Sequence, residues 1–114
     1  MKIIKNSIII QELKEMALNS FGDFVKAVVD TERNVIAFDA ELHSDLEEML
    51  LNDGSNQSEL WGINLYPENA GKEDFIEYDS LINIRPLQNN KSRYVENEET
   101  RKKISEMVQE KVIL

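Results

Sequence analysis

The sequence of 114 residues contains no cysteine, one histidine and two prolines. Without cysteine, the chain has no disulfide framework, no thiolate nucleophile and no cysteine-ligated zinc site. No apolar run approaches the roughly 18–20 residues that a membrane-spanning helix needs. The first residues also lack the apolar segment and cleavage site of a secretory signal peptide. We therefore expect a cytoplasmic protein that makes no contact with a membrane.

Acidic residues outnumber basic ones by 22 to 13, but they are unevenly distributed. From Glu41 to Asp79 there are eleven acids and one base, so this acidic block carries −10 and the remainder of the chain +1. Residues 80–95 contain no acid and three bases. General nucleic-acid binding is not expected, because it depends on neutralising phosphates. The charge indicates either a solubilising surface or a local anion site within an acidic protein.

The hydrophobic pattern predicts a mainly antiparallel sheet. Strand-like segments lie at residues 2–5, 24–29, 35–38, 60–66 and 75–78, and another at 81–84 either continues the last or stands alone. The polar break at 30–34 separates two apolar runs, which is typical of an antiparallel hairpin. In the segment 60–66 the alternation places two sets of side chains on opposite faces: Trp61, Ile63 and Leu65 on one, and Gly62, Asn64 and Tyr66 on the other.

Helical spacing of apolar residues predicts three helices, which begin near Ile10, at Ser44 and after Asn97. The second is expected to start with a capping box from Ser44 to Glu47, and Asn97 is expected to cap the third. Short connections favour antiparallel pairing. The order β-α-β-β-α-β-β-α therefore predicts a single α+β domain over residues 1–114, with the sheet and three helices in two layers.

His43 is the only histidine, and it lies between two acids, Glu41 and Asp45. Two carboxylates and an imidazole are ligand types that suit Fe, Mn or Zn, and a Glu–His pair suits acid–base chemistry. One hypothesis is therefore a metal-assisted enzyme that uses these three residues. The alternative is a structural histidine that forms a hydrogen bond at a strand end or near a helix start.

Polar side chains also alternate within strand-like sequence, with Asn64 and Tyr66 in one segment and Asn83 and Arg85 in another. Large polar residues are not selected for β propensity. They indicate either a solvated sheet face or a converging pocket of amides, a phenol and a guanidinium, in which each buried group needs a partner.

Residues 85–93 carry two arginines and a lysine among amides and a hydroxyl, just ahead of the helix expected after Asn97. Arginine forks suit carboxylate or phosphate, and a helix start adds N–H donors. The alternative is that these arginines neutralise acids of the same chain, such as Asp79 or Glu77.

Three motifs are distinctive: ELHxD at residues 41–45, LWGINLYP at 60–67 and DSxINIRPxQxNxSRxVE at 79–96. With them the chain resembles, over nearly its whole length, a small uncharacterised prokaryotic family of unknown function. The resemblance implies a single compact domain and no particular activity. It singles out the same polar residues that are unusual in strands.

We predict a non-enzymatic binding or interaction domain with a polar surface for a small anion or a protein partner, formed by Asn64, Tyr66, Asn83, Arg85 and Arg93. One alternative is the metal-assisted enzyme using Glu41, His43 and Asp45, and another is an acidic partner of a basic protein. The sequence identifies no cofactor. A homodimer is compatible with the apolar residues 112–114.

Overall fold

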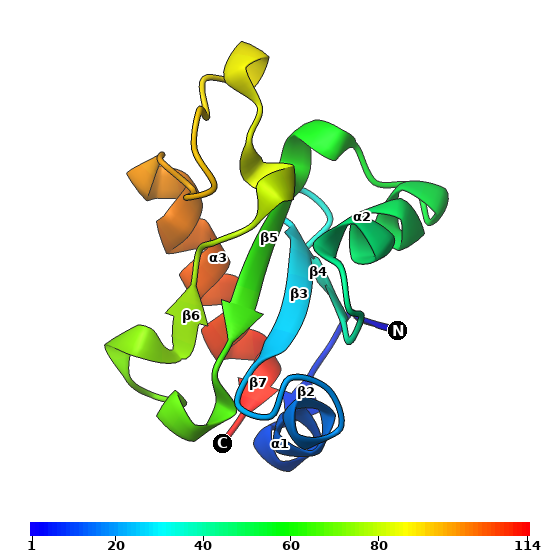
Figure 1. The fold of residues 1–114 in the computed structure, drawn as a ribbon, viewed down its shortest axis with the longest axis vertical. Coiled ribbons are helices and arrows are strands. Elements are labelled where there is room, and N and C mark those ends of the chain that lie inside the picture. Colours follow the sequence, from blue (N-terminus) through cyan, green and yellow to red (C-terminus); the bar gives the residue numbers. More distant parts are fainter.

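The computed structural model describes residues 1–114 and has a five-stranded antiparallel sheet at its centre (Figure 1). In spatial order the strands are β1 (Lys2–Ile4), β4 (Val35–Phe38), β3 (Val25–Asp30), β5 (Leu60–Leu65) and β6 (Ile76–Glu77). The predicted hairpin is confirmed, because β3 pairs with β4 in antiparallel register. The predicted α+β class, with an antiparallel sheet and three helices, is also confirmed.

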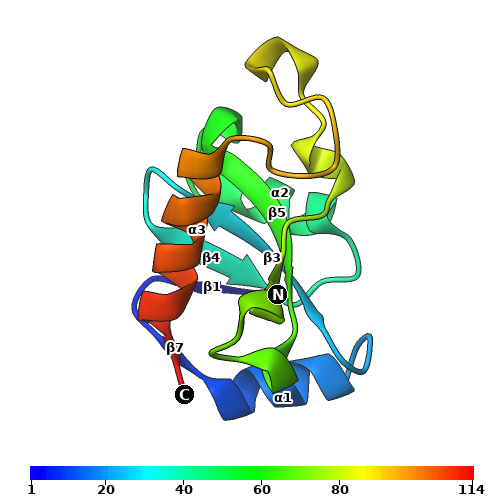
Figure 2. The same cartoon turned by 90° about the vertical axis from the view of Figure 1, so that its left-hand side faces the viewer.

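The helices cover both faces of the sheet (Figure 2). On one face α1 (Ile10–Leu18) and α3 (Glu98–Lys111) pack against the larger core, whereas α2 (His43–Asn52) packs on the other face against a smaller core. The expectation that all helices lie on one face is therefore wrong for α2. The reason is that β3 is apolar on both sides: Val29 belongs to the α3 core and Val28 to the α2 core.

The helix starts differ from each other. Asn97 caps α3 as predicted, because its Oδ1 accepts a hydrogen bond from the backbone N–H of Thr100 at 3.0 Å. The capping box predicted for α2 is wrong: the helix begins one residue before Ser44, and Leu42 at its N-cap provides no side-chain acceptor. The first backbone N–H groups of α2 therefore have no side-chain cap.

The segment at 81–84 is not a strand. Leu81–Asn83 forms a 3₁₀ turn that crosses over Gly62 of β5, where an added Cβ would come within 2.5 Å of Ser80 Cβ. This close crossing replaces strand pairing with side-chain contacts. Where β6 ends, the remaining edge of β5 is consequently completed by side chains of residues 83–85.

A second, parallel sheet of two short strands joins β2 (Ile8–Ile9) to β7 (Val112–Ile113). It ties the two ends of the chain together beside α1 (Figures 1 and 2). None of the helices combines the length and apolar character needed to cross a bilayer.

Candidate functional site

Asn83 completes the edge of β5 where β6 no longer reaches. Its Oδ1 accepts from Gly62 N–H at 2.8 Å, and its Nδ2 donates to Gly62 O and to Arg93 O, both at 3.0 Å. The side chain is fully buried. One amide thus supplies the acceptor and the donor that a neighbouring strand would present to Gly62. We therefore assign a structural role to Asn83.

Arg85 likewise completes the edge of β5, at Leu60, two residues before Gly62. Its guanidinium donates to Leu60 O and Gln57 O, and Cζ lies 4.2 Å from the centre of the Trp61 ring. Burial lowers the pKa of Arg85 from its ordinary value. The donors aimed at these carbonyls are not free for an anion. The two-residue spacing of Asn83 and Arg85 matches that of Gly62 and Leu60.

Asn64 and Tyr66 converge on a single carboxylate, that of Glu77. Asn64 Nδ2 donates to Glu77 Oε1 at 2.8 Å, and the Tyr66 hydroxyl donates to the same oxygen at 3.2 Å. Burial raises the pKa of Tyr66, and the nearby charge of Glu77 raises it further. Asn64 is buried, yet its Oδ1 has no hydrogen-bond partner.

Arg93 borders the same region but is already paired. Its Nε donates to Asp79 Oδ1 at 2.6 Å and its Nη2 to Asp79 Oδ2 at 3.2 Å, which makes a two-pronged ion pair. The alternative that this arginine neutralises an acid of the same chain is confirmed. The structure thus brings Asn64, Tyr66 and Arg93 together and places Asn83 and Arg85 along a different part of β5.

His43 opens α2 and is held by the sheet. Its Nε2 lies 2.8 Å from Ile63 O, and because a carbonyl can only accept, we assign the proton to Nε2. Burial lowers the pKa of His43, and the charge of Lys26 lowers it further. The interpretation of His43 as a structural residue near a helix start is confirmed.

The metal hypothesis is not supported by the side-chain arrangement. The structure gathers no group of three or more His, Cys, Asp or Glu side chains that could hold a metal ion. Glu41 and Asp45 are exposed, whereas His43 is buried with Nε2 against the sheet. The expected triad of Glu41, His43 and Asp45 is therefore not formed, because the start of α2 at His43 separates the three side chains.

A pocket of about 430 Å³ lies on the α2 face of the sheet, between the start of α2 and residues 79–82. Its floor crosses three strands, since Lys26 is the register partner of Asn64 and Asn64 that of Glu77. Neither Lys26 nor Glu77 forms an ion pair. We call this the polar pocket; its lining is Phe24, Lys26, Leu42, His43, Ser44, Asn64, Glu77, Asp79, Ser80, Leu81, Ile82 and Arg93.

Sequence reasoning missed Lys26 and Glu77 as site residues. Lys26 is a single charged residue in an apolar run, and Glu77 is one of eleven acids in the acidic block. Their relation to Asn64 depends on the pairing register of β3, β5 and β6. A charged residue within an otherwise apolar run was the one signal in the sequence that could have identified Lys26.

Comparison with known proteins gives a family and no mechanism. No curated protein and no solved structure matches the chain. A family model described as "Protein of unknown function (DUF5674)" matches residues 2–111. This match covers nearly the whole chain and confirms the resemblance to a family of unknown function. The chain belongs to the DUF5674 family.

Proposed function

We propose that this protein is a non-enzymatic binding domain whose polar pocket takes a small polar ligand. The observation that carries the proposal is the pair of opposite charges in the lining of that pocket, Lys26 and Glu77, which lie on either side of Asn64 and form no ion pair. A ligand that pairs with these charges would form charge-assisted hydrogen bonds, which are roughly twice as strong as neutral ones.

Two features of the polar pocket favour an anionic group on the ligand. Lys26 has no carboxylate partner, and its Nζ lies 5.2 Å from the centre of the Phe21 ring. The start of α2 opens into the same pocket with Leu42, His43 and Ser44, and no side chain caps its N–H groups. A helix start of this kind attracts negative charge.

The opposite side of the polar pocket favours a hydrogen-bond donor on the ligand. The Glu77 carboxylate accepts from Asn64 and Tyr66 but faces no cation, so it can accept from an ammonium or hydroxyl group. A ligand that carries a carboxylate together with an amino or hydroxyl group satisfies both sides. We therefore favour small amino acids and hydroxy acids over simple anions such as phosphate or acetate.

NMR titration of amide resonances tests this proposal. We expect millimolar serine or lactate to shift residues 42–44, Asn64 and Glu77, with smaller shifts from acetate, phosphate and nucleotides. Lys26→Met should abolish the shifts because it removes the charge and keeps an apolar side chain. Lys103→Met, at an exposed position of α3, is the matched control and should leave them unchanged. If none of these compounds perturbs the polar pocket, the proposal is wrong.

A further inference from the structure

The outer edge of β6 has free main-chain groups. Tyr66 N–H donates to Phe75 O at 2.9 Å, so Phe75 and, two residues on, Glu77 direct their main-chain groups toward β5. The main-chain groups of Ile76 therefore point away from the sheet, and the same alternation continued one residue past the end of β6 gives those of Tyr78 the same direction. Because β6 is the last strand in the sheet order, no other strand pairs with them.

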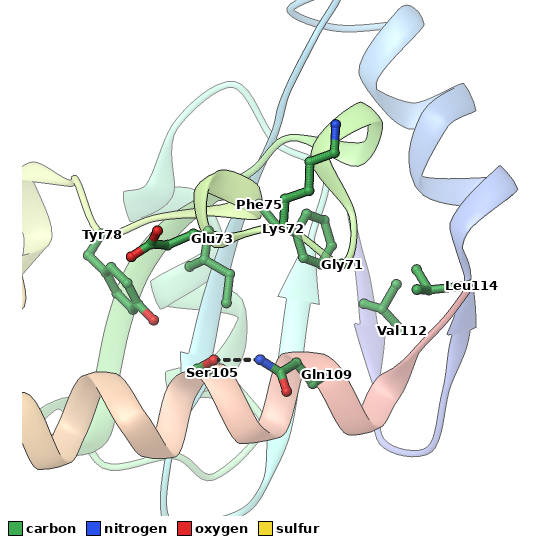
Figure 3. Close-up of a pocket in the computed structure, with 10 residues that line it drawn as sticks. Gly71, Lys72, Glu73, Phe75, Tyr78, Ser105, Gln109, Val112 and Leu114 are labelled. Carbon is green, nitrogen blue, oxygen red and sulfur yellow. Dashed lines mark hydrogen bonds between the residues drawn. The ribbon is translucent and has the colours of Figure 1, made fainter.

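A groove of about 650 Å³ runs along one side of this edge, between β6 and α3 (Figure 3). Five of its ten lining residues are hydrophobic and Lys72 and Glu73 also line it; we call it the apolar groove. Phe75 and Tyr78 lie above it, and Ser105 and Gln109, joined at 2.9 Å, lie below on α3. Val112 and Leu114 close its far end. The groove can accept apolar side chains that point to the α3 side of the sheet.

An acidic groove of about 890 Å³ lies on the opposite side of the same edge, with four carboxylates in its lining: Glu73, Asp74, Glu77 and Asp79. Of these, only Asp79 has an ion-pair partner, Arg93. Ile76 and Tyr78 line both grooves, so the two meet along the open edge of β6.

We propose that an extended basic segment of a partner protein adds to β6 as a further strand. Its main chain would bond to Ile76 and Tyr78, as in other cases of strand addition. Side chains alternate across a strand, so one set enters the apolar groove and the other faces the carboxylates. The fitting segment thus alternates apolar residues with lysine or arginine.

Charge complementarity favours a basic segment, rather than a second copy of the chain, as the strand that adds to β6. Two copies paired through β6 would bring the carboxylates of Glu73, Asp74 and Glu77 against those of the neighbour, and facing like charges destabilise a strand pair. A basic segment instead pairs with these three free carboxylates. The proposal gives a location to the hypothesis of an acidic partner for a basic protein. The acidic groove shares Glu77, Asp79 and Arg93 with the polar pocket, but strand addition at β6 needs neither Lys26 nor Asn64.

A six-residue peptide of alternating valine and lysine, blocked at both ends, is the probe. In an NMR titration at low salt we expect it to shift the amides of Ile76 and Tyr78, and to bind at least tenfold more tightly than a peptide with the same residues in two blocks. Equal affinity for the two peptides would overturn the proposal, because charge alone would then explain binding.

Methylation of the peptide main chain tests strand addition itself. Two further peptides carry N-methyl groups on one or the other alternate set of residues, and only the set that faces β6 should lose at least tenfold in affinity. If neither set weakens binding, no strand is added and the proposal is wrong.

Paired protein variants test the acidic groove. Glu73→Gln combined with Asp74→Asn should weaken the valine–lysine peptide several-fold and reduce the salt dependence of its binding. Glu15→Gln combined with Glu48→Gln removes the same charge from exposed positions of α1 and α2. Equal weakening by both pairs would contradict a local contact. Lys26→Met should leave peptide binding unchanged, which separates this proposal from that of the polar pocket.

Discussion

Asn83 and Asn64 are both asparagines in strand-like sequence, with 0% and 6% of their surface exposed. The oxygen and the nitrogen of the Asn83 amide both form hydrogen bonds with the backbone of Gly62. The amide of Asn64 leaves Oδ1 unpaired beside a pocket. The first amide replaces a missing strand, whereas the second lies in the lining of the polar pocket that we propose as a ligand site. Residue type alone did not separate these roles, because the difference lies in what each oxygen faces.

Asn83→Ala should lower the free energy of unfolding by about 3 kcal/mol, since Gly62 N–H, Gly62 O and Arg93 O lose buried partners. Urea unfolding followed by circular dichroism measures this loss. Asn6→Ala, at an exposed site, is the control and should stay within about 0.5 kcal/mol of the wild type. A wild-type midpoint for Asn83→Ala would show that Asn83 is not needed to complete β5.

His43 should make stability fall as the solution becomes acidic. Its pKa is lowered in the folded protein by burial, so the unfolded chain binds the proton more readily. The contribution is complete above the unfolded pKa of about 6.5 and is lost as pH falls through the lower folded pKa. Urea unfolding between pH 7.5 and 5.5 should show this decline, and His43→Gln should remove it over that interval.

The imidazole can be followed directly, because the chain has one histidine. Its carbon-bound proton resonance should titrate below pH 6.5 in the folded protein and near 6.5 in urea. A folded-state titration at or above pH 6.5 would contradict the burial of His43 between the start of α2 and the sheet.

At the scale of elements, residues 80–96 differ most from the sequence prediction. Instead of a strand, residues 81–83 and 86–88 form short 3₁₀ turns, and residues 91–97 are irregular but held by side chains. Asn90 Nδ2 lies within hydrogen-bond distance of Asn83 O, Ser92 O and Tyr94 O. Glu96 accepts from Ser92 and from the Lys91 backbone, which lowers its pKa. Periodicity could not predict these contacts, because they join side chains to carbonyls rather than strand to strand.

The crossing of this segment over β5 requires glycine at position 62. Gly62→Ala should destabilise the protein by about 1–3 kcal/mol, because the new methyl would lie within 2.6 Å of both Cβ and Oγ of Ser80. Thermal unfolding measures the loss. The double variant Gly62→Ala with Ser80→Gly should recover part of it, since the clashing atoms are removed. A Gly62→Ala protein as stable as the wild type would contradict the close crossing.

At the scale of the whole molecule, the sequence predicted the α+β class, the hairpin and the final helix, because each depends on local periodicity and capping. It did not predict that α2 covers the opposite face, since Val28 and Val29 read as one apolar run. The polar pocket follows from that arrangement: α2 packs over Val28, and the pocket lies between the start of α2 and the strand positions of Lys26, Asn64 and Glu77. Two of the five predicted surface residues, Asn83 and Arg85, therefore have structural roles. Asn64 and Arg93 line the polar pocket, and Tyr66 joins them only through its hydrogen bond to Glu77.

Amide hydrogen exchange at Gly62 in the wild-type protein tests most directly the claim that side chains complete the sheet. The Gly62 N–H faces away from β3 and has Asn83 Oδ1 as its acceptor. We predict that it exchanges as slowly as the amide of Asn64, which lies where β6 still pairs with β5. Exchange at Gly62 as fast as that of an exposed loop amide would contradict the structural role of Asn83. It would also contradict the distinction between Asn83, which completes the sheet, and Asn64, which lines the polar pocket.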